Sequence, residues 1–329
     1  LNTFSAIYNK GDYGDESDFI NEFEKELNNM HFTFPTGESL YLDLDKFVRA
    51  HSEPVPSTSP YAQFKVMELA KDNVVVTLDG QGADEILAGY HYFYGFYFKE
   101  LIGKYKFLKL TTEIYHYLKI HKSLLGLKSL VYFMLPDFMK TNVRSNQTFY
   151  ILRKFADKYK NSNNVTKNIY NSKTLNGALI DHVNHKLEHL LKWEDRNSMF
   201  FSLESRVPFL DHNLVEKTIA STSEIKINKG MTKQVLRHSM TGILPEKIRN
   251  RVDKIGFGTP AKKWFIDKKF KDCFYDLYQS GNKIKDIVDI KKIDDIFYKH
   301  QSGEKDYSKE IWKIINLSLW FNIFKNYIK

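Results

Sequence analysis

Cysteine is nearly absent from this 329-residue chain, in which Cys273 is the single example. One cysteine can form neither an internal disulfide framework nor a multi-cysteine zinc or iron–sulfur site. This composition is typical of a reducing compartment, so we expect a cytoplasmic protein. Cys273 lies in a lysine-rich segment without an evident histidine partner, which predicts a packing role rather than a reactive thiol.

Long apolar runs and a signal-peptide pattern are also missing. A membrane-spanning helix needs about 20 consecutive apolar residues, and the longest candidate, residues 124–139, is interrupted by Lys128, Pro136 and Asp137. We therefore expect no membrane partner. The chain begins at Leu1 rather than at methionine, so we expect an N-terminal truncation.

The charge balance is basic but dispersed. Lysine and arginine number 49 against 40 aspartate and glutamate residues, a net charge of +9. Proteins that bind nucleic acid concentrate their positive charge on one face, whereas here lysines alternate with acids along the whole chain. We expect no nucleic-acid partner and keep a basic nucleic-acid binder only as an alternative.

Residues 1–95 read as alternating strands and helices. Apolar strands joined by helices predict an α/β fold with a parallel sheet covered on both faces. The expected strands are Thr3–Tyr8, His31–Phe34 and Val74–Leu78, and the expected helices are Asp18–Asn28, Leu40–His51 and Tyr61–Lys71.

Residues 96–329 read as helical, with no internal repeat and no linker that would separate independent domains. From Leu175 onward, Leu179, Val183, Leu187 and Leu190 form one apolar stripe. If this helix continues, Glu194 and Asn197 face inward and need polar partners or a ligand. His182, His185 and His189 share a face that we expect to lie away from the stripe, which argues against a metal site.

The strongest local signal is the turn Asp79–Glu85 after the third expected strand. Its two glycines would let backbone N–H groups approach a ligand at the edge of an open sheet. Glu85 stands where a dinucleotide fingerprint would have its third glycine, and two adjacent acids suit a Mg²⁺-nucleotide. The alternative is a structural turn whose acids interact with a helix dipole.

Two further segments carry candidate chemistry. Glu204, Arg206 and Asp211 could form either a ligand pocket or a structural ion network. The loop Lys247–Lys254, followed by Ile255–Pro260, has the cations and flanking glycines expected of a clamp over phosphates, with a solvated surface loop as its alternative.

Together these segments resemble the synthetase half of glutamine-dependent asparagine synthetases. The matching blocks keep their order along the chain: Val75–Glu85 with Gly89–Tyr90, then Glu194–Met199 with Arg206–Asp211, then Thr232–Lys233, Leu244–Pro245 and Lys254–Pro260. The resemblance implies an adenine-nucleotide alpha-hydrolase type of parallel sheet with a large C-terminal helical part. It also implies ATP and Mg²⁺ as cofactors.

In that family ATP activates aspartate as β-aspartyl-adenylate, and ammonia then displaces AMP. Carried over by motif position, the resemblance assigns ATP binding to Ala6, Asp79 and Gly80, substrate binding to Gln81, Glu85, Tyr90 and Arg206, and catalysis to Asp84, Glu204 and Lys254. Asp84 is also the expected Mg²⁺ ligand. Partners are expected to be small molecules, and a homodimer of the full-length protein is compatible with the resemblance.

Two departures from the family pattern limit the resemblance. Gln81 stands where the family usually has an acid, and glutamine cannot act as a general base. The pyrophosphate-binding Ser-Gly-Gly-x-Asp-Ser stretch and the glutaminase domain are not in the chain, so we expect the chain alone to form no adenylate at a useful rate. The alternatives are amidation of another carboxylate, such as a sugar acid in surface-polysaccharide synthesis, and a non-catalytic relative.

Overall fold

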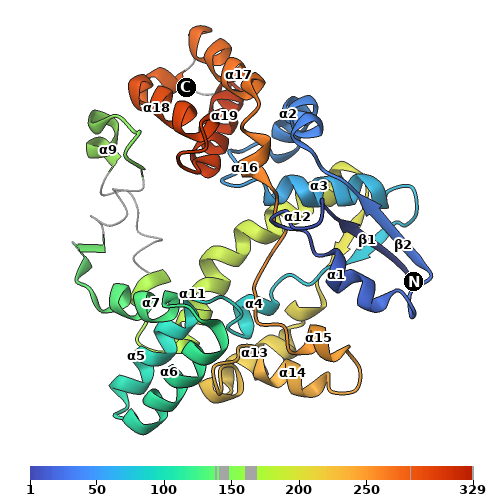
Figure 1. Cartoon of the computed structure of the whole chain (residues 1–329), viewed down its shortest axis with the longest axis vertical. Helices are drawn as coiled ribbons and strands as arrows, with labels where there is room; N and C mark the ends of the chain where they lie inside the picture. The colour runs from blue at the N-terminus through green and yellow to red at the C-terminus, as the bar shows by residue number, and fades with distance from the viewer. Residues whose placement is uncertain (138, 141–147, 160–168, 282, 328–329) are drawn as a thin grey trace.

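A computed structural model of the chain describes residues 1–137, 139–140, 148–159, 169–281 and 283–327, most of which are helical (Figure 1). The strands are β1 (Asn2–Ala6), β2 (Asn29–Thr33), β3 (Val76–Leu78) and β4 (Glu204–Arg206). The helices are α1 (Ser17–Ile20), α2 (Gly37–His51), α3 (Ser59–Ala70), α4 (Ala83–Ile86), α5 (Phe93–Gly103), α6 (Phe107–His121), α7 (Leu125–Met134), α9 (Arg153–Tyr159), α11 (Leu175–His182), α12 (Glu188–Phe200), α13 (His212–Ala220), α14 (Gln234–Ser239), α15 (Glu246–Arg249), α16 (Ala261–Trp264), α17 (Lys268–Gln279), α18 (Ile290–Gln301) and α19 (Ser308–Ile323).

The strands form two separate parallel pairs. Strand β1 pairs with β2, with Phe4 opposite His31, and β3 pairs with β4, with Leu78 opposite Arg206. The α/β class is therefore confirmed, but one continuous sheet is not found among the described residues. Strand β4 contradicts the expectation of helices alone after residue 95. The tripeptide that forms it has no apolar run, and only its pairing with β3 makes it a strand.

Helix coverage of the strands differs from the expected double cover. Helix α3 packs against β1 and β2, and its Met67 and Ala70 join Phe4 in a small apolar cluster. At β3, in contrast, the last residue Leu78 is 70% exposed, and Val75 directly before the strand is 77% exposed. The expectation of helices on both faces is therefore wrong for β3 in the part of the chain that the structure describes.

The expected N-terminal helices form with different lengths. The segment expected to be helical over Asp18–Asn28 forms only α1 and a 3-10 turn, Asn21–Phe23. Helix α2 begins earlier than expected because Thr36 forms a capping box with Ser39, in which each side chain accepts the other's backbone N–H. Behind this cap, the spacing of Leu40, Leu44, Phe47 and Val48 gives α2 a fully buried apolar face.

We expect Thr36→Ala to lower the free energy of unfolding by about 1 kcal/mol, because it leaves a backbone N–H of the first turn without its acceptor. Urea unfolding measures this change. Thr111→Ala is the matched control, since Thr111 lies inside α6 and alanine is the better helix former there. Equal stability of Thr36→Ala and the wild type would contradict the capping role.

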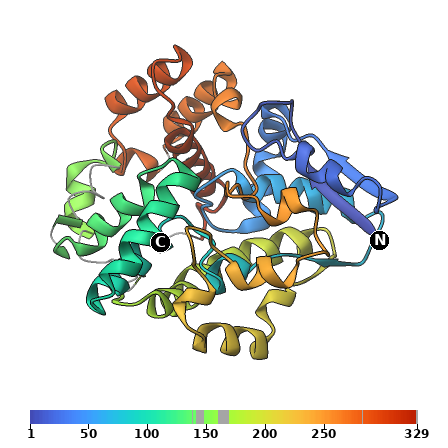
Figure 2. The same ribbon diagram turned by 60° about the horizontal axis from the view of Figure 1, so that its bottom comes forward.

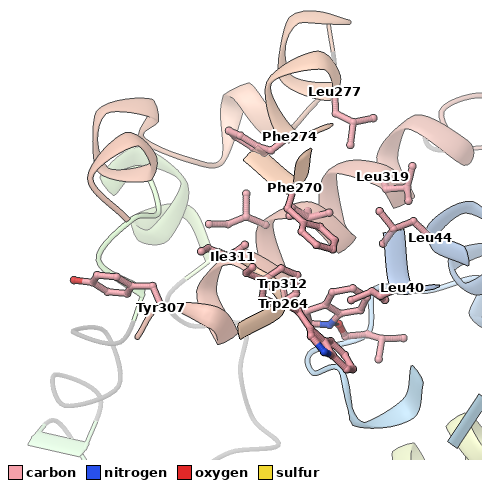
Figure 3. Close-up of a cluster of buried hydrophobic side chains, with 14 of the residues drawn as sticks. Leu40, Leu44, Trp264, Phe270, Phe274, Leu277, Tyr307, Ile311, Trp312 and Leu319 are labelled. Atoms are coloured by element: carbon pink, nitrogen blue, oxygen red, sulfur yellow. Dashed lines mark hydrogen bonds between the residues drawn. The ribbon is translucent and has the colours of Figure 1, made fainter. Parts of the chain in front are cut away.

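The largest apolar core joins the N-terminal helices to the C-terminal ones. In Figure 3, Leu40 and Leu44 of α2 face the aromatic side chains of Trp264, Phe270 and Trp312. A second core lies among α5, α6, α7 and α11, which both views place apart from β1 and β2 (Figure 2). The helices therefore pack into two groups, and α12 lies between them in Figure 1.

Helix α19 fixes a loop that is distant in the sequence. The Trp312 Nε1 donates to the carbonyl of Val55 at 2.8 Å, and the backbone N–H of Val55 donates to Asn316 Oδ1 at 2.7 Å. Both backbone groups of Val55 are thus satisfied by the C-terminal helix. This holds the loop before α3 in place.

The helix that starts at Leu175 does continue, as predicted. A π-helical turn, Val183–Leu187, joins α11 to α12, and Glu194 and Asn197 are 2% and 0% exposed. Asn197 Oδ1 accepts from His51 Nε2 at 2.9 Å, and Asn197 Nδ2 donates to the carbonyl of Pro60 at 2.9 Å. The inward prediction is confirmed, and Asn197 connects α12 to α2 and α3.

The structure bears on the predictions made from the single cysteine and from the lack of long apolar runs. Cys273 packs against the largest core, and burial raises the pKa of its thiol to about 11, which agrees with a packing role. Among the described residues, no helix has both the length and the apolar character that crossing a bilayer requires.

Candidate functional site

Seven of the ten predicted site residues line a single pocket of about 600 Å³. They are Asp79, Gly80, Gln81, Asp84, Glu85, Tyr90 and Lys254. The turn after β3 forms one wall, the start of α3 contributes Ser59, and α12 contributes Trp193. The pocket therefore lies at the carboxyl end of a parallel strand, where open α/β sheets bind ligands.

The turn Asp79–Glu85 is held by strand pairing and by one indispensable glycine. The backbone N–H of Asp79 donates to the carbonyl of Arg206 at 2.8 Å, which extends the pairing of β3 and β4. Gly82 has φ +91°, and a side chain there would clash with Leu210. Glycine alone combines this backbone conformation with this close approach.

Asp84 lies between two lysine ammonium groups. Lys233 Nζ is 2.8 Å from Oδ1, and Lys254 Nζ is 2.9 Å from Oδ2. Burial raises the pKa of Asp84, but the two lysines outweigh it and hold the pKa below its ordinary value. Gly89 packs against the same carboxylate so closely that any side chain would overlap it. Asp84 is therefore an ionised, rigidly held partner of both lysines.

A second acidic group lies deeper, where Asp79 approaches Glu194 of α12. Burial and the neighbouring Asp79 raise the pKa of Glu194 to about 8. Ser205 Oγ is 2.9 Å from Asp79 Oδ2 and also contacts Glu194. A hydroxyl has one proton, so Ser205 can donate to Asp79 while accepting from Glu194 only if Glu194 is protonated. The raised pKa and the hydrogen bonds agree on this protonated state.

Aromatic side chains and the partly buried lysine Lys186 form another wall of the pocket. The Tyr90 hydroxyl donates to Glu85 Oε1 at 2.5 Å, and the Tyr90 and Tyr92 rings stack with their centroids 5.3 Å apart. Lys186 Nζ lies 3.7 Å from the Tyr90 centroid. Burial lowers the pKa of Lys186, while Glu85 and Asp84 oppose this effect. The wall thus offers an aromatic face and a positive charge to an anionic ligand.

The remaining three predicted residues do not line this pocket. Ala6 is the last residue of β1. Glu204 and Arg206 belong to β4, where their side chains pair at 2.7 Å and are each 61% exposed. The structure therefore shows one exposed ion pair, without Asp211, in place of the three-residue ion network considered as the alternative, and the assigned roles of Glu204 and Arg206 stay predictions.

Several residues at or beside the pocket were not among the predicted ones: Lys186 lines it, whereas Lys233, Glu194 and Ser205 contact its acidic residues from outside the lining. Lys186 belongs to the π-helical turn, and its role has no signal in the sequence beyond its spacing from the apolar stripe. Lys233 lies within a matching block but carries no motif of its own. Glu194 could be found from its inward position on the predicted helix, whereas Ser205 depends on β4, which was missed.

The histidine-rich face needs a correction. His182 does not lie away from the apolar stripe but is 1% exposed, with its ring 5.3 Å from that of Tyr92 and 4.8 Å from that of Phe93. It follows Leu179 by three residues, which places both on one helical face. No group of three or more histidine, cysteine or acidic side chains suited to a metal ion occurs among the residues that the structure describes.

The residues of the pocket suit a nucleotide better than they suit Mg²⁺. Glycines, serine hydroxyls, aromatic rings and two lysines are a donor set that suits a nucleotide phosphate and base. For Mg²⁺, both oxygens of Asp84 already contact ammonium groups, so an ion on Asp84 would compete with Lys233 and Lys254. Mg²⁺ commonly binds through one or two carboxylates together with substrate phosphates, and the Asp84 assignment stays a prediction.

A strand end, a glycine turn and opposed acids and lysines define an α/β protein with a ligand pocket at its sheet edge. Comparison with known proteins specifies the family, because the asparagine synthase family matches residues 1–322. The chain belongs to this family.

Individual relatives agree with the family match. Asparagine synthetase [glutamine-hydrolyzing] 1 of Bacillus subtilis is 25% identical and aligns with 100% of the chain and 53% of its own length. A putative asparagine synthetase of Mycobacterium bovis is 27% identical over 83% of the chain and 43% of its own length. Asparagine synthetase 3 of Bacillus subtilis is 45% identical, but over only 20% of the chain. The chain thus spans about half the length of the first two relatives.

Proposed function

We propose that the chain is the synthetase part of a ligase that uses ATP to convert aspartate to asparagine. Ammonia would come from glutamine, supplied by a domain outside these residues. The observation that carries the proposal is the convergence of the Asp79–Glu85 turn and Lys254 on one pocket, although they are far apart in the sequence. Family membership supports ATP-dependent amidation.

The proposed reaction has two steps. An oxygen of the substrate carboxylate attacks the α-phosphorus of ATP, and the bond to the β-phosphate breaks to release pyrophosphate. Ammonia then attacks the acyl carbon, the carbon–oxygen bond breaks, and AMP leaves with that electron pair while nitrogen loses a proton. Such chemistry depends mainly on positioning and on neutralising phosphate charge.

The residues of the pocket would divide these tasks. Asp79 and Gly80 would contact the nucleotide, and Lys254, aligned by Asp84, would face the phosphates. Glu85 and Tyr90 hold each other by a hydrogen bond and would border the substrate. Mg²⁺, when bound, would neutralise phosphate charge. Gln81 would bind substrate without acting as a base.

The predicted contacts outside the pocket complete the proposal. Ala6, at the end of β1, would contact the adenine. Glu204 and Arg206 would form the acceptor pocket, which requires their exposed ion pair to turn toward the bound substrate. These three assignments rest on the family resemblance.

The alternative acceptor has one supporting observation. Glu204 and Arg206, the residues assigned to the aspartate pocket, pair with each other on the surface instead of lining the main pocket. Together with Gln81, this favours a different carboxylate, such as a sugar acid, as the second candidate substrate.

Exchange of labelled pyrophosphate into ATP tests both candidate substrates. The measurement uses a polypeptide that extends the chain to the length of its relatives, with aspartate or a panel of sugar acids as the carboxylate. We expect exchange that depends on aspartate. Exchange with a sugar acid alone would select the second substrate, and absence of both exchange and nucleotide binding would indicate a non-catalytic relative.

A further inference from the structure

A second pocket of about 280 Å³ lies behind the lysines that hold Asp84. It is bounded by α14, α15, the loop 250–255 and the start of α5. Lys254 lines both pockets, so its ion pair with Asp84 forms part of the wall between them. The volume is small for a nucleotide and suits a compact ligand.

The charged residues of this second pocket are mostly cations, and one of them has no acid beside it. Arg251 pairs with Glu16 and Asp253, and Arg249 pairs with Glu246. Arg237 differs, because no ion pair links it to an acid among the described residues.

The hydrogen bonds of Arg237 leave part of its guanidinium available. Its Nε donates to the carbonyl of Thr232 at 2.8 Å, and its Nη1 donates to the carbonyl of Arg249. Within the described part of the chain, no hydrogen bond uses its Nη2. A guanidinium has five N–H donors, so Arg237 is positioned by two backbone carbonyls and retains donors for an oxyanion.

The wall beside Arg237 is apolar. Leu236, Met240, Ile248 and Val252 line the pocket together with Arg237. Aliphatic side chains lower the local dielectric and strengthen a charged contact there. They also offer nothing to the outer oxygens of an inorganic ion, but they can pack against a short hydrocarbon body.

A further polar group also lines the second pocket. His91 lines the pocket, and its Nδ1 is buried without a hydrogen-bond partner among the described residues. The neighbouring His121 ring lies 4.8 Å away, but its Nε2 is occupied by the carbonyl of Gly230 at 2.8 Å. An unsatisfied buried nitrogen is costly unless a ligand or water pairs with it.

We propose that this second pocket binds a small aliphatic carboxylic acid. Its carboxylate would accept hydrogen bonds from Arg237, and its hydrocarbon body would lie on Leu236, Met240 and Ile248. The inference does not depend on the proposed amide chemistry. Because Lys254 lines both pockets, a ligand in the second pocket would affect ligand binding in the first.

Calorimetric titration of the chain with the series acetate, butyrate and hexanoate tests the proposal. Each added methylene group buried in the pocket is expected to tighten binding about fourfold. Inorganic phosphate and hexanol are the comparison ligands and are expected to bind more weakly than hexanoate. Affinity independent of chain length, or tighter binding of phosphate than of hexanoate, would overturn the proposal.

Paired variants locate the site without removing the bonds that Arg237 makes to the backbone. Met240→Glu places a carboxylate on the pocket wall, and Met240→Gln is its neutral match. We expect Met240→Glu to bind hexanoate at least about tenfold more weakly than Met240→Gln, the loss of one charge-assisted contact. Equal affinities would overturn the assignment to Arg237.

A third variant separates the two pockets. Lys186 lines the first pocket and not the second. Lys186→Met is therefore expected to leave hexanoate binding unchanged. Loss of binding in this variant would place the acid in the first pocket and overturn the proposal.

Discussion

Replacing Lys254 with methionine is expected to lower ATP–pyrophosphate exchange about a thousandfold in the polypeptide extended to the length of its relatives. Lys254 Nζ is 2.9 Å from Asp84, and its side chain is 32% exposed and lines the first pocket. A fixed cation in this position stabilises charge that develops on the phosphates. Methionine keeps an unbranched side chain and removes only the charge and its hydrogen bonds.

Two comparisons separate this role from a structural one. Lys268→Met removes a lysine that is 80% exposed at the start of α17 and is expected to leave exchange unchanged. Adding Asp84→Asn to Lys254→Met removes the charge that Lys254 would neutralise in a purely structural role. Recovery of exchange in this double variant would contradict a catalytic role for both residues, and we expect none.

Glu194→Gln is expected to remove about 3 kcal/mol of pH dependence from stability between pH 5.5 and 7.5. Burial and Asp79 raise the pKa of Glu194 from 4.5 to about 8 in the folded protein. Between those two pH values the folded state therefore holds a proton that the unfolded chain releases. Glu194 thus makes the folded state less stable as the pH rises through this window, and neutral glutamine cannot.

Urea unfolding at pH 5.5, 6.5 and 7.5 measures the effect as the difference between variant and wild type. His51 and His182, whose pKa values burial lowers to about 4, contribute the opposite slope below about pH 6.5. Their contribution cancels in the difference. Glu188→Gln, on the exposed side of the same helix, is the control. If the free energies of unfolding of variant and wild type differed by the same amount at all three pH values, a raised pKa of Glu194 would be excluded.

The predictable part of the fold is the part that local patterns encode. Apolar spacing after Leu175 placed Glu194 inward because a helix repeats every 3.6 residues, and a π-helical turn did not disturb that outcome. Strand β4 could not be found this way. Its three residues are all polar, so the strand shows no alternation of apolar and polar residues. Its conformation comes from hydrogen bonds with β3, which is distant in the sequence.

In the candidate site, too, local patterns could be predicted and contacts between distant residues could not. The turn Asp79–Glu85 has its glycines and acids adjacent in sequence, so its place at a strand end could be predicted. The contacts of Lys186 with Tyr90 and of Lys233 with Asp84 could not, because the chain has many lysines and only folding selects their partners. Asp84 as a carboxylate between two lysines is likewise visible only in three dimensions.

The attachment of Val55 to α19 makes one wall of the first pocket depend on a helix that is synthesised late. Ser57 and Ser59 line the first pocket, and the loop that carries Ser57 and leads into Ser59 at the start of α3 is held by Trp312 and Asn316. On the ribosome the N-terminal part emerges first, so this wall of the pocket lacks its support until α19 has left the exit tunnel. We therefore expect ligand binding at the first pocket to require a chain synthesised through α19.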